Sequence, residues 1–267
     1  MNTIVEVPTL GQPAQRRRFT WLWVLLSGVV LYWLVLFVTV ATANVLLFPT
    51  LLLVGALIVP LTVLTRANRS PHGIPGGVVP LQLLGLVSLL SGVVGVLLAS
   101  GLEFTLVNPH GAWPMLAVAL IEESVKLIVP VVVLAAGLAR RPGSGVVVGV
   151  ASGAGFAVLE TMGYAFAALL RTGSLGAVDQ TLLLRGVFAP ACHIAWTGIA
   201  AAMMWRAVRL GGRAGDVVLA VAAGAWVVLL HAFWDSIASG PAHVGMAVVS
   251  LVLLWVAMRL ELRGSRP

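Results

Sequence analysis

Long apolar runs constrain the fold of this chain more than any other feature. Its 267 residues hold eight of them, each close to the roughly 20 residues that a helix needs to cross a bilayer. Lipid offers no hydrogen bonds, so a segment inside it must pair its own backbone groups, as a helix does. The eight predicted spans are residues 19–40, 45–64, 78–100, 113–139, 146–171, 184–207, 217–239 and 243–258. We therefore predict an all-α polytopic membrane protein with about eight transmembrane helices.

A single transmembrane domain, residues 19–260, accounts for nearly all of the chain. Residues 1–18 and 261–267 are expected to be cytoplasmic tails. The first apolar run follows Arg16, Arg17 and Arg18, as the core of a cleaved signal sequence would. It is longer than the roughly 7–15 residues of such a core, so we expect it to remain as the first span.

The shortage of charge excludes several classes of protein. Charged residues make up 9% of the chain, against about 25% in a soluble domain, which excludes a soluble enzyme and a disordered protein. The single cysteine, Cys192, excludes an internal disulfide framework. A net charge of +7 would indicate nucleic-acid binding in a soluble protein. Here the arginines flank apolar runs, so we expect the lipid bilayer as a partner and no nucleic acid.

The basic residues predict the topology. With the N-terminus inside, thirteen of them fall in inner segments and two, Arg171 and Arg185, in outer ones. Cytoplasmic loops carry the excess of Lys and Arg, so both termini are expected inside the cell. Abundant Ala, Gly, Val and Arg indicate a GC-rich bacterial genome, and hence the bacterial cytoplasmic (inner) membrane.

The nine acidic residues are the most informative part of the composition. Five are expected outside the spans: Glu6, Glu103, Asp179, Asp216 and Glu261. Four acids, two histidines and the only lysine fall inside predicted spans: Glu122, Glu123, Lys126, Glu160, His193, His231 and Asp235. A charge at the bilayer centre costs at least about 2.5–3.5 kcal/mol, so these side chains should face one another around a polar cavity.

Spacing along the helices refines this arrangement. Glu122 and Lys126, like His231 and Asp235, are four residues apart and share a helix face. At about 1.5 Å per residue, the polar groups of the fourth to seventh spans lie about 6–16 Å below the outer surface. Glycines at positions 145, 149 and 153 form a stripe that favours close packing of the fifth span against a neighbour. A polar bundle of the fourth to seventh helices, in the outer half of the bilayer, is the resulting prediction.

This set of side chains is suited to hydrolysis. Two His nitrogens with one or two carboxylates can bind Zn²⁺ and leave a position open for water, while a further carboxylate acts as general base. Without metal, a carboxylate can activate water directly and an imidazole can stabilise the oxyanion. The sequence contains neither a serine elbow nor an HEXXH motif. A proton-coupled transporter, whose relay uses the same residue types, is the alternative.

Four motifs in order resemble the PrsW family of intramembrane proteases, which is related to CAAX-type endoproteases and bacteriocin-processing enzymes. They are the EExxK element at 122–126, GFxxxE at 155–160, the stretch from Arg185 through Pro190 to His193 and Trp196, and HxxWD at 231–235. The resemblance covers about residues 110–240. One departure is Thr161, where the family often has Asn.

The resemblance implies a protease that cleaves membrane-anchored proteins, such as an anti-sigma factor cut on its extracytoplasmic side. We expect Glu122 to be the general base, with Glu123 as its modulator or proton shuttle and Lys126 tuning the charge. The expected ligands of a divalent metal, Zn²⁺ first, are Glu160, His193 and His231, with Asp235 as fourth ligand or orienting group. Two alternatives stay open: a metal-free glutamate mechanism, and an inactive family member that acts as a membrane scaffold.

Overall fold

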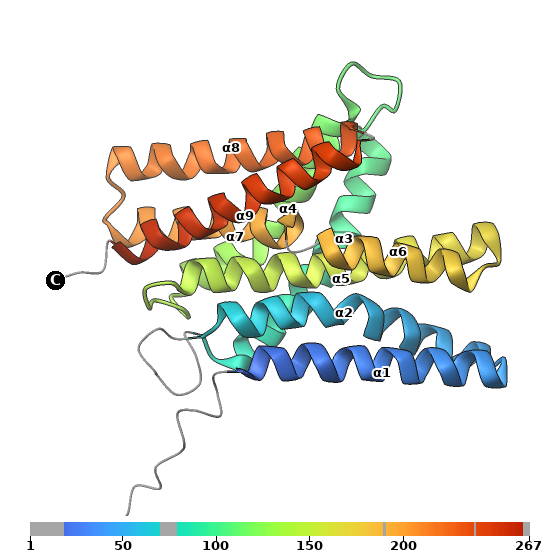
Figure 1. Cartoon of the computed structure of the whole chain (residues 1–267). Helices are drawn as coiled ribbons and strands as arrows, with labels where there is room; N and C mark the ends of the chain where they lie inside the picture. The colour runs from blue at the N-terminus through green and yellow to red at the C-terminus, as the bar shows by residue number, and fades with distance from the viewer. Residues whose placement is uncertain (1–18, 70–78, 189–190, 238, 264–267) are drawn as a thin grey trace, which may run out of the picture.

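The computed structural model describes residues 19–69, 79–188, 191–237 and 239–263, and every regular element in these ranges is helical. The elements are α1 (Thr20–Thr42), the 3₁₀ turn η2 (Val45–Leu47), α2 (Phe48–Ala67), α3 (Leu81–Leu106), α4 (Pro114–Ala135), α5 (Ser144–Thr172), α6 (Leu175–Phe188), α7 (His193–Arg209), α8 (Ala214–Ser236) and α9 (Gly240–Arg263). The long helices form one bundle (Figure 1). The predicted all-α polytopic fold is confirmed. The expected N-terminal tail, residues 1–18, lies outside the described residues.

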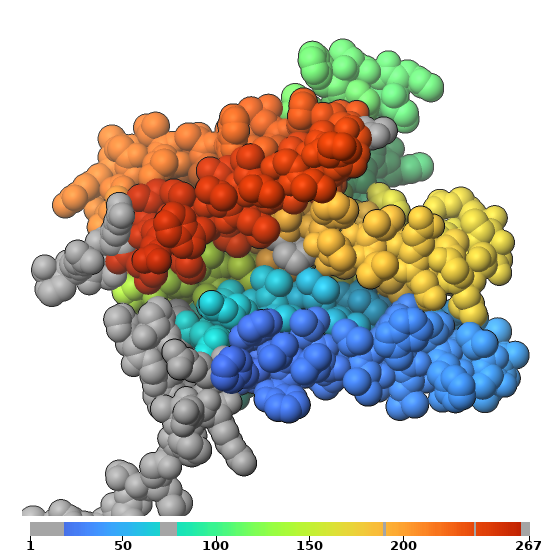
Figure 2. Space-filling model, in the orientation of Figure 1, coloured from blue at the N-terminus to red at the C-terminus, as the bar shows by residue number. Residues whose placement is uncertain are grey.

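Among the described residues, seven helical segments are long and apolar enough to cross a membrane. The helix α4 has a similar length, 22 residues, but it carries the three charges of Glu122, Glu123 and Lys126. Burial differs widely between these segments: α5 is 83% buried in its most apolar stretch, whereas α1 is only 6% buried. Accordingly, α1 (blue) forms one edge of the molecule in Figure 2, and exposes the apolar side chains expected of a lipid-facing helix.

The sixth predicted span is wrong as a continuous helix. Where residues 184–207 were expected to form one helix, α6 ends at Phe188 and α7 begins at His193. Pro190 lies between them in the sequence, and a proline removes a backbone donor and clashes with the preceding turn. The interruption makes His193 the first residue of a helix, so its depth cannot be counted along one helix from Arg185.

The helix α5 occupies the centre of the bundle, packed against α2, α3, α6 and α7. It approaches α3 most closely at Gly155, where a methyl group would overlap the carbonyl oxygen of Ser88, and it approaches α7 closely along the predicted glycine stripe. A methyl group on Gly145 would lie 2.5 Å from Cβ of Trp205, and one on Gly149 would lie 2.5 Å from the carbonyl oxygen of Thr197. One on Gly153 would overlap the carbonyl oxygen of His193. The stripe therefore sets the distance between α5 and the helix that carries His193.

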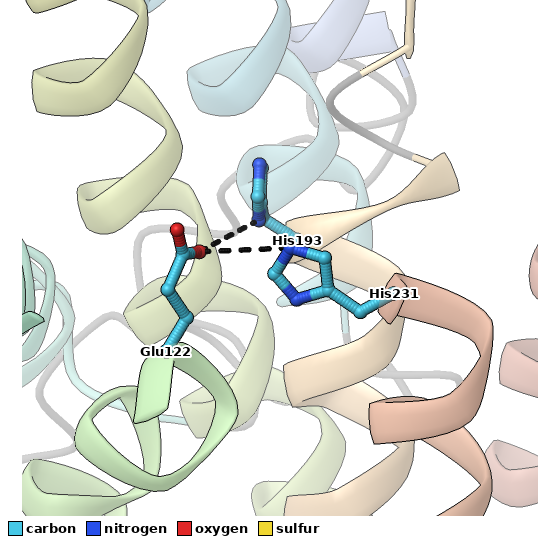
Figure 3. A group of neighbouring side chains, drawn as sticks. All are labelled: Glu122, His193 and His231. Atoms are coloured by element: carbon cyan, nitrogen blue, oxygen red, sulfur yellow. Dashed lines mark ion pairs between the residues drawn. The ribbon is translucent and has the colours of Figure 1, made fainter. Parts of the chain in front are cut away.

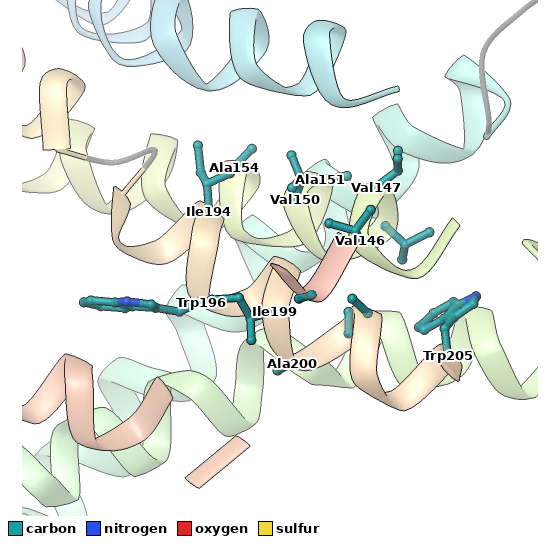
Figure 4. Close-up of a cluster of buried hydrophobic side chains, with 14 of the residues drawn as sticks. Val146, Val147, Val150, Ala151, Ala154, Ile194, Trp196, Ile199, Ala200 and Trp205 are labelled. Carbon is teal, nitrogen blue, oxygen red and sulfur yellow. The ribbon is translucent and has the colours of Figure 1, made fainter. Parts of the chain in front are cut away.

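Apolar side chains fill the rest of this interface. In Figure 4, valines and alanines of α5 meet the aliphatic residues of α7, with Trp196 and Trp205 at the two ends of the row. The indole N–H of Trp205 donates to the carbonyl oxygen of Ala139 (2.7 Å), and that of Trp196 donates to Oγ of Ser250 (2.9 Å). Both buried indoles are thus paired, which avoids the cost of an unsatisfied donor.

The N-terminus of α5 is held by a carboxylate from α9. Glu261, 1% exposed, accepts hydrogen bonds from the backbone N–H groups of Gly145 (2.8 Å) and Val146 (2.9 Å). A negative charge at a helix N-terminus satisfies free donors and is favoured by the helix dipole. The helix α9 extends to Arg263, so the first three residues of the expected C-terminal tail are helical.

The glycine stripe leads to a stability prediction. Gly153→Ala should lower the free energy of unfolding by about 1–3 kcal/mol, the usual cost of overpacking, because the new methyl group meets the backbone at His193. Gly163→Ala is the matched control. Gly163 lies on the same helix, α5, and a methyl group added there would meet no neighbouring atom within 4 Å. Unfolding of both variants in the same detergent measures the difference, and equal stabilities would contradict the prediction.

Candidate active site

Seven polar side chains that the sequence singles out lie in one connected group. The helix α4 contributes Glu122, Glu123 and Lys126, α5 contributes Glu160, α7 contributes His193, and α8 contributes His231 and Asp235. Neighbouring members are 2.8–3.2 Å apart. Five of them are buried: Glu122, Glu123, Lys126, His193 and His231. The four helices thus turn their ionisable groups inward, as the cost of exposing them to lipid requires.

Lys126 lies at the centre of the group and is fully buried. Its Nζ donates to Oε2 of Glu122 (2.9 Å) and Oε1 of Glu123 (2.8 Å), and lies 2.8 Å from Nδ1 of His193. It also lies 4.3 Å from the ring centroid of Phe156, a distance at which a cation is attracted to the ring face. The three N–H groups of the ammonium therefore have three partners.

Each imidazole is held by a carboxylate on one of its nitrogens. His231 Nδ1 donates to Oε1 of Glu123 (2.9 Å). Because an ammonium can only donate, His193 accepts from Lys126 at Nδ1, and the proton of its neutral ring is on Nε2. That nitrogen lies 2.9 Å from Oε2 of Glu160. Carboxylate partners of this kind fix the tautomer and orientation of metal-binding histidines.

Arg185 is part of this arrangement, although the sequence analysis left it in an outer connector. It lies on α6, and its Nη2 is 2.5 Å from Oε2 of Glu160, while its guanidinium carbon lies 4.1 Å from the ring centroid of Tyr164. The available signals were that Arg185 is one of the two basic residues assigned to outer segments and that it begins the third family motif. Its contacts place a positive charge behind the carboxylate that faces His193.

The nitrogen of each imidazole that is not held by Glu123 or Glu160 faces Glu122. Nδ1 of His193 and Nε2 of His231 lie 4.0 and 3.8 Å from its Oε2, and Figure 3 shows the three side chains converging from three helices. Nε2 of His231 also lies 3.2 Å from Oδ2 of Asp235. With Nδ1–H used by Glu123, Nε2 is an acceptor. Acceptors this close to each other need a proton or a cation between them.

This group has the donor types that a divalent metal requires. Glu122, His193 and His231 are buried, and one ligand atom from each lies within 4.8 Å of the others; among the described residues they are the one such group found. Glu160, expected as a ligand, is not in it, because it contacts the opposite nitrogen of His193. Lys126 contacts two of the three ligand atoms, so a metal would have to displace its ammonium from them.

A cavity of about 550 Å³ opens onto this group. Its lining residues are Glu103, Met115, Val118, Glu122, Glu160, Thr161, Tyr164, Leu184, Arg185, Phe188, Cys192, His193, Trp234, Asp235 and His243. Glu103 was expected beyond the end of the third span. It lies instead in the last turn of α3, which continues to Leu106. The reactive groups therefore line a space large enough to receive part of a substrate.

Comparison with known proteins agrees with the motifs. A family model described as "PrsW family intramembrane metalloprotease" matches residues 77–260, which include all seven residues of the group. No curated protein and no solved structure matches the chain.

Proposed function

Because the chain belongs to the PrsW family of intramembrane metalloproteases, we propose that it hydrolyses peptide bonds of membrane-anchored protein substrates near the outer leaflet. The observation that supports this most is the buried group of Glu122, His193 and His231 beside a cavity of about 550 Å³. A segment containing an anti-sigma factor-type cleavage site is the substrate class that the family resemblance implies. Thirteen basic residues fall in the predicted inner segments and two in the outer ones, which favours both termini inside the cell. With that orientation, the cavity would open on the extracytoplasmic side.

We assign the metal to Glu122, His193 and His231, and Zn²⁺ suits two imidazoles and a carboxylate best. A metal bound there supplies a Lewis acid for the substrate carbonyl and lowers the pKa of a bound water. In this assignment Glu122 is a ligand instead of the general base. Glu123 holds His231 instead of acting as modulator or proton shuttle, and Glu160 holds His193 instead of acting as a ligand. Lys126 balances the negative charge of the carboxylates on α4.

Asp235 is our choice for the group that moves protons when a metal is present. Its side chain is 30% exposed and lines the cavity, and its Oδ2 lies 3.2 Å from His231. It can accept the proton of the attacking water and return it to the departing amine, as a general base and then a general acid. Arg185 and Glu160 keep the His193 ring fixed during this transfer.

The metal-free mechanism uses the same side chains in other roles. Glu122 then takes the proton of water, and a protonated imidazole of His193 or His231 stabilises the oxyanion. Glu122 is essential in both mechanisms, whereas metal content separates them. Full activity of a protein freed of metal by a chelator would favour the glutamate mechanism.

The test of the function is cleavage in a defined membrane. The full chain is reconstituted into lipid vesicles with single-span proteins that carry short flanking segments, and mass spectrometry locates the cut. We expect cuts near the outer end of the substrate span. Substrate-dependent proton flux without cleavage would instead support the transporter, and neither activity would support the inactive scaffold.

The assigned roles also predict graded metal binding. Glu160→Gln should weaken metal affinity by about 10–100-fold, the usual effect of losing a partner that orients a ligand histidine. His231→Ala should remove binding altogether, since it deletes a ligand. Competition with a chelating dye measures both constants, and Asp216→Asn, at a distant ion pair with Arg206, serves as control. Complete loss of metal in Glu160→Gln would instead favour Glu160 as a direct ligand.

A further inference from the structure

Four carboxylates line the cavity, and three of them have partners of opposite charge or a histidine. Glu122 is paired with Lys126, Glu160 with Arg185, and Asp235 with His231. The fourth, Glu103, is different. The residue is partly exposed, but its Oε1 is buried and has no hydrogen-bond partner among the described residues, which is costly for a buried polar atom.

The position of Glu103 relative to the reactive group follows from the two helices at this end. Glu103 lies in the last turn of α3, and α4 begins after a short connection. Met115, Val118 and Glu122 line the same cavity from one face of α4. Met115 and Glu122 are seven residues apart in the helix, which corresponds to about 10 Å along its axis. Glu103 and Met115 thus lie at the same end of this pair of helices, and both line the cavity that reaches Glu122.

The charge of the cavity is unbalanced around Glu103. Arg185 is the one Arg or Lys among the lining residues of the described chain. Its guanidinium is already engaged by Glu160 on one side and by the ring of Tyr164 on the other. No positive side chain of the lining is therefore left for Glu103. A charged donor supplied by the substrate would complete the hydrogen bonding of its buried Oε1, and a charge-assisted hydrogen bond is stronger than a neutral one.

We propose that Glu103 is a specificity-determining residue: it binds a Lys or Arg side chain of the substrate, within about three residues of the bond that is cut. This range follows because the cavity runs along about 10 Å of α4, from Met115 to Glu122, and an extended chain covers about 3.3 Å per residue. This inference rests on the proposed protease function and adds a preference for substrates with a basic residue at one position.

The experiment uses the full chain in lipid vesicles and single-span peptides that carry one Lys, Gln or Glu, moved through positions two to four on each side of the cut. For the wild type, kcat/KM should be about tenfold higher with Lys than with Gln at one of these positions, the effect expected of a charge-assisted hydrogen bond. Glu103→Gln should lose this preference, Glu103→Asp should keep part of it, and Glu103→Lys should reverse it in favour of Glu.

A matched control and a second readout keep the outcomes distinct. Asp216→Asn removes one negative charge from the opposite end of α8 and should keep the wild-type preference. Binding of the same peptides to the Glu122→Gln variant should show the same tenfold ratio of Kd values without cleavage. Equal kcat/KM for Lys and Gln in the wild type, or an unchanged preference in Glu103→Lys, overturns the subsite. If no peptide is cleaved but the Lys peptides still bind more tightly than the Gln peptides, the protease function is overturned while the binding of a basic side chain by Glu103 is supported.

Discussion

Replacing Glu122 with Gln should reduce peptide-bond cleavage by about 10²–10⁴-fold. The reason is that Glu122 provides either a metal ligand or the general base, and groups in such roles contribute about 10²–10⁴-fold each. Glutamine has nearly the same volume and can still accept from Lys126, so the fold should persist. The measurement is the initial rate of cleavage of a single-span substrate, with thermal unfolding as a check on folding.

Metal analysis of the same protein separates the two mechanisms. If Glu122 is a ligand, the purified Glu122→Gln protein should contain far less bound zinc than the wild type. Asp235→Asn is the matched comparison, because it should lose activity and retain metal. Full activity of Glu122→Gln would contradict the assignment of the active site. Equal metal content in the three proteins would leave Glu122 as a base and remove it from the ligand set.

Replacing Lys126 with Met should cost about 3–5 kcal/mol of stability, the usual result of removing one member of a buried ion pair. Lys126 is fully buried and contacts the carboxylates of Glu122 and Glu123. Without its ammonium, two neighbouring negative charges remain inside the bundle. Denaturant or thermal unfolding of the chelator-treated protein in one detergent measures the loss.

A charge-matched variant tests the cause of that loss. Adding Glu122→Gln and Glu123→Gln to Lys126→Met removes all three charges, so most of the stability should return. Zinc should stabilise Lys126→Met more than the wild type, because the metal no longer has to displace an ammonium from Glu122 and His193. A single variant as stable as the wild type, or a triple variant no better than the single, would contradict this account.

Much of the fold could be predicted because membrane helices are specified locally. The fifth span was placed at 146–171, and α5 covers Ser144–Thr172. The prediction of one continuous helix failed between α6 and α7. The sequence stays apolar across the point where the helix is interrupted, and Pro190 is the one residue that indicates the interruption. Hydropathy also ended the third span at 100, whereas α3 continues to Leu106. That error left Glu103 outside the site.

The membership of the polar group could also be predicted, because the cost of placing charges in lipid leaves few alternatives. The pairing inside the group could not. Which nitrogen of His193 faces Glu160 depends on the rotation of two helices and the side-chain rotamers, neither of which a spacing along one helix specifies. Arg185 was named in a family motif, but its role could not be predicted for a similar reason, since its contact with Glu160 joins two helices.

The carboxylate of Glu261 at the N-terminus of α5 has a practical consequence for defining this protein as a unit. The family match ends at residue 260, one residue before the side chain that holds Gly145 and Val146. It begins at residue 77, so it also omits α2, which packs against α5 and α6. A chain trimmed to the matched boundaries would retain the whole reactive group. It would lose the support of the central helix at one end and along one side, so we expect a chain trimmed in this way to be less stable than the full chain.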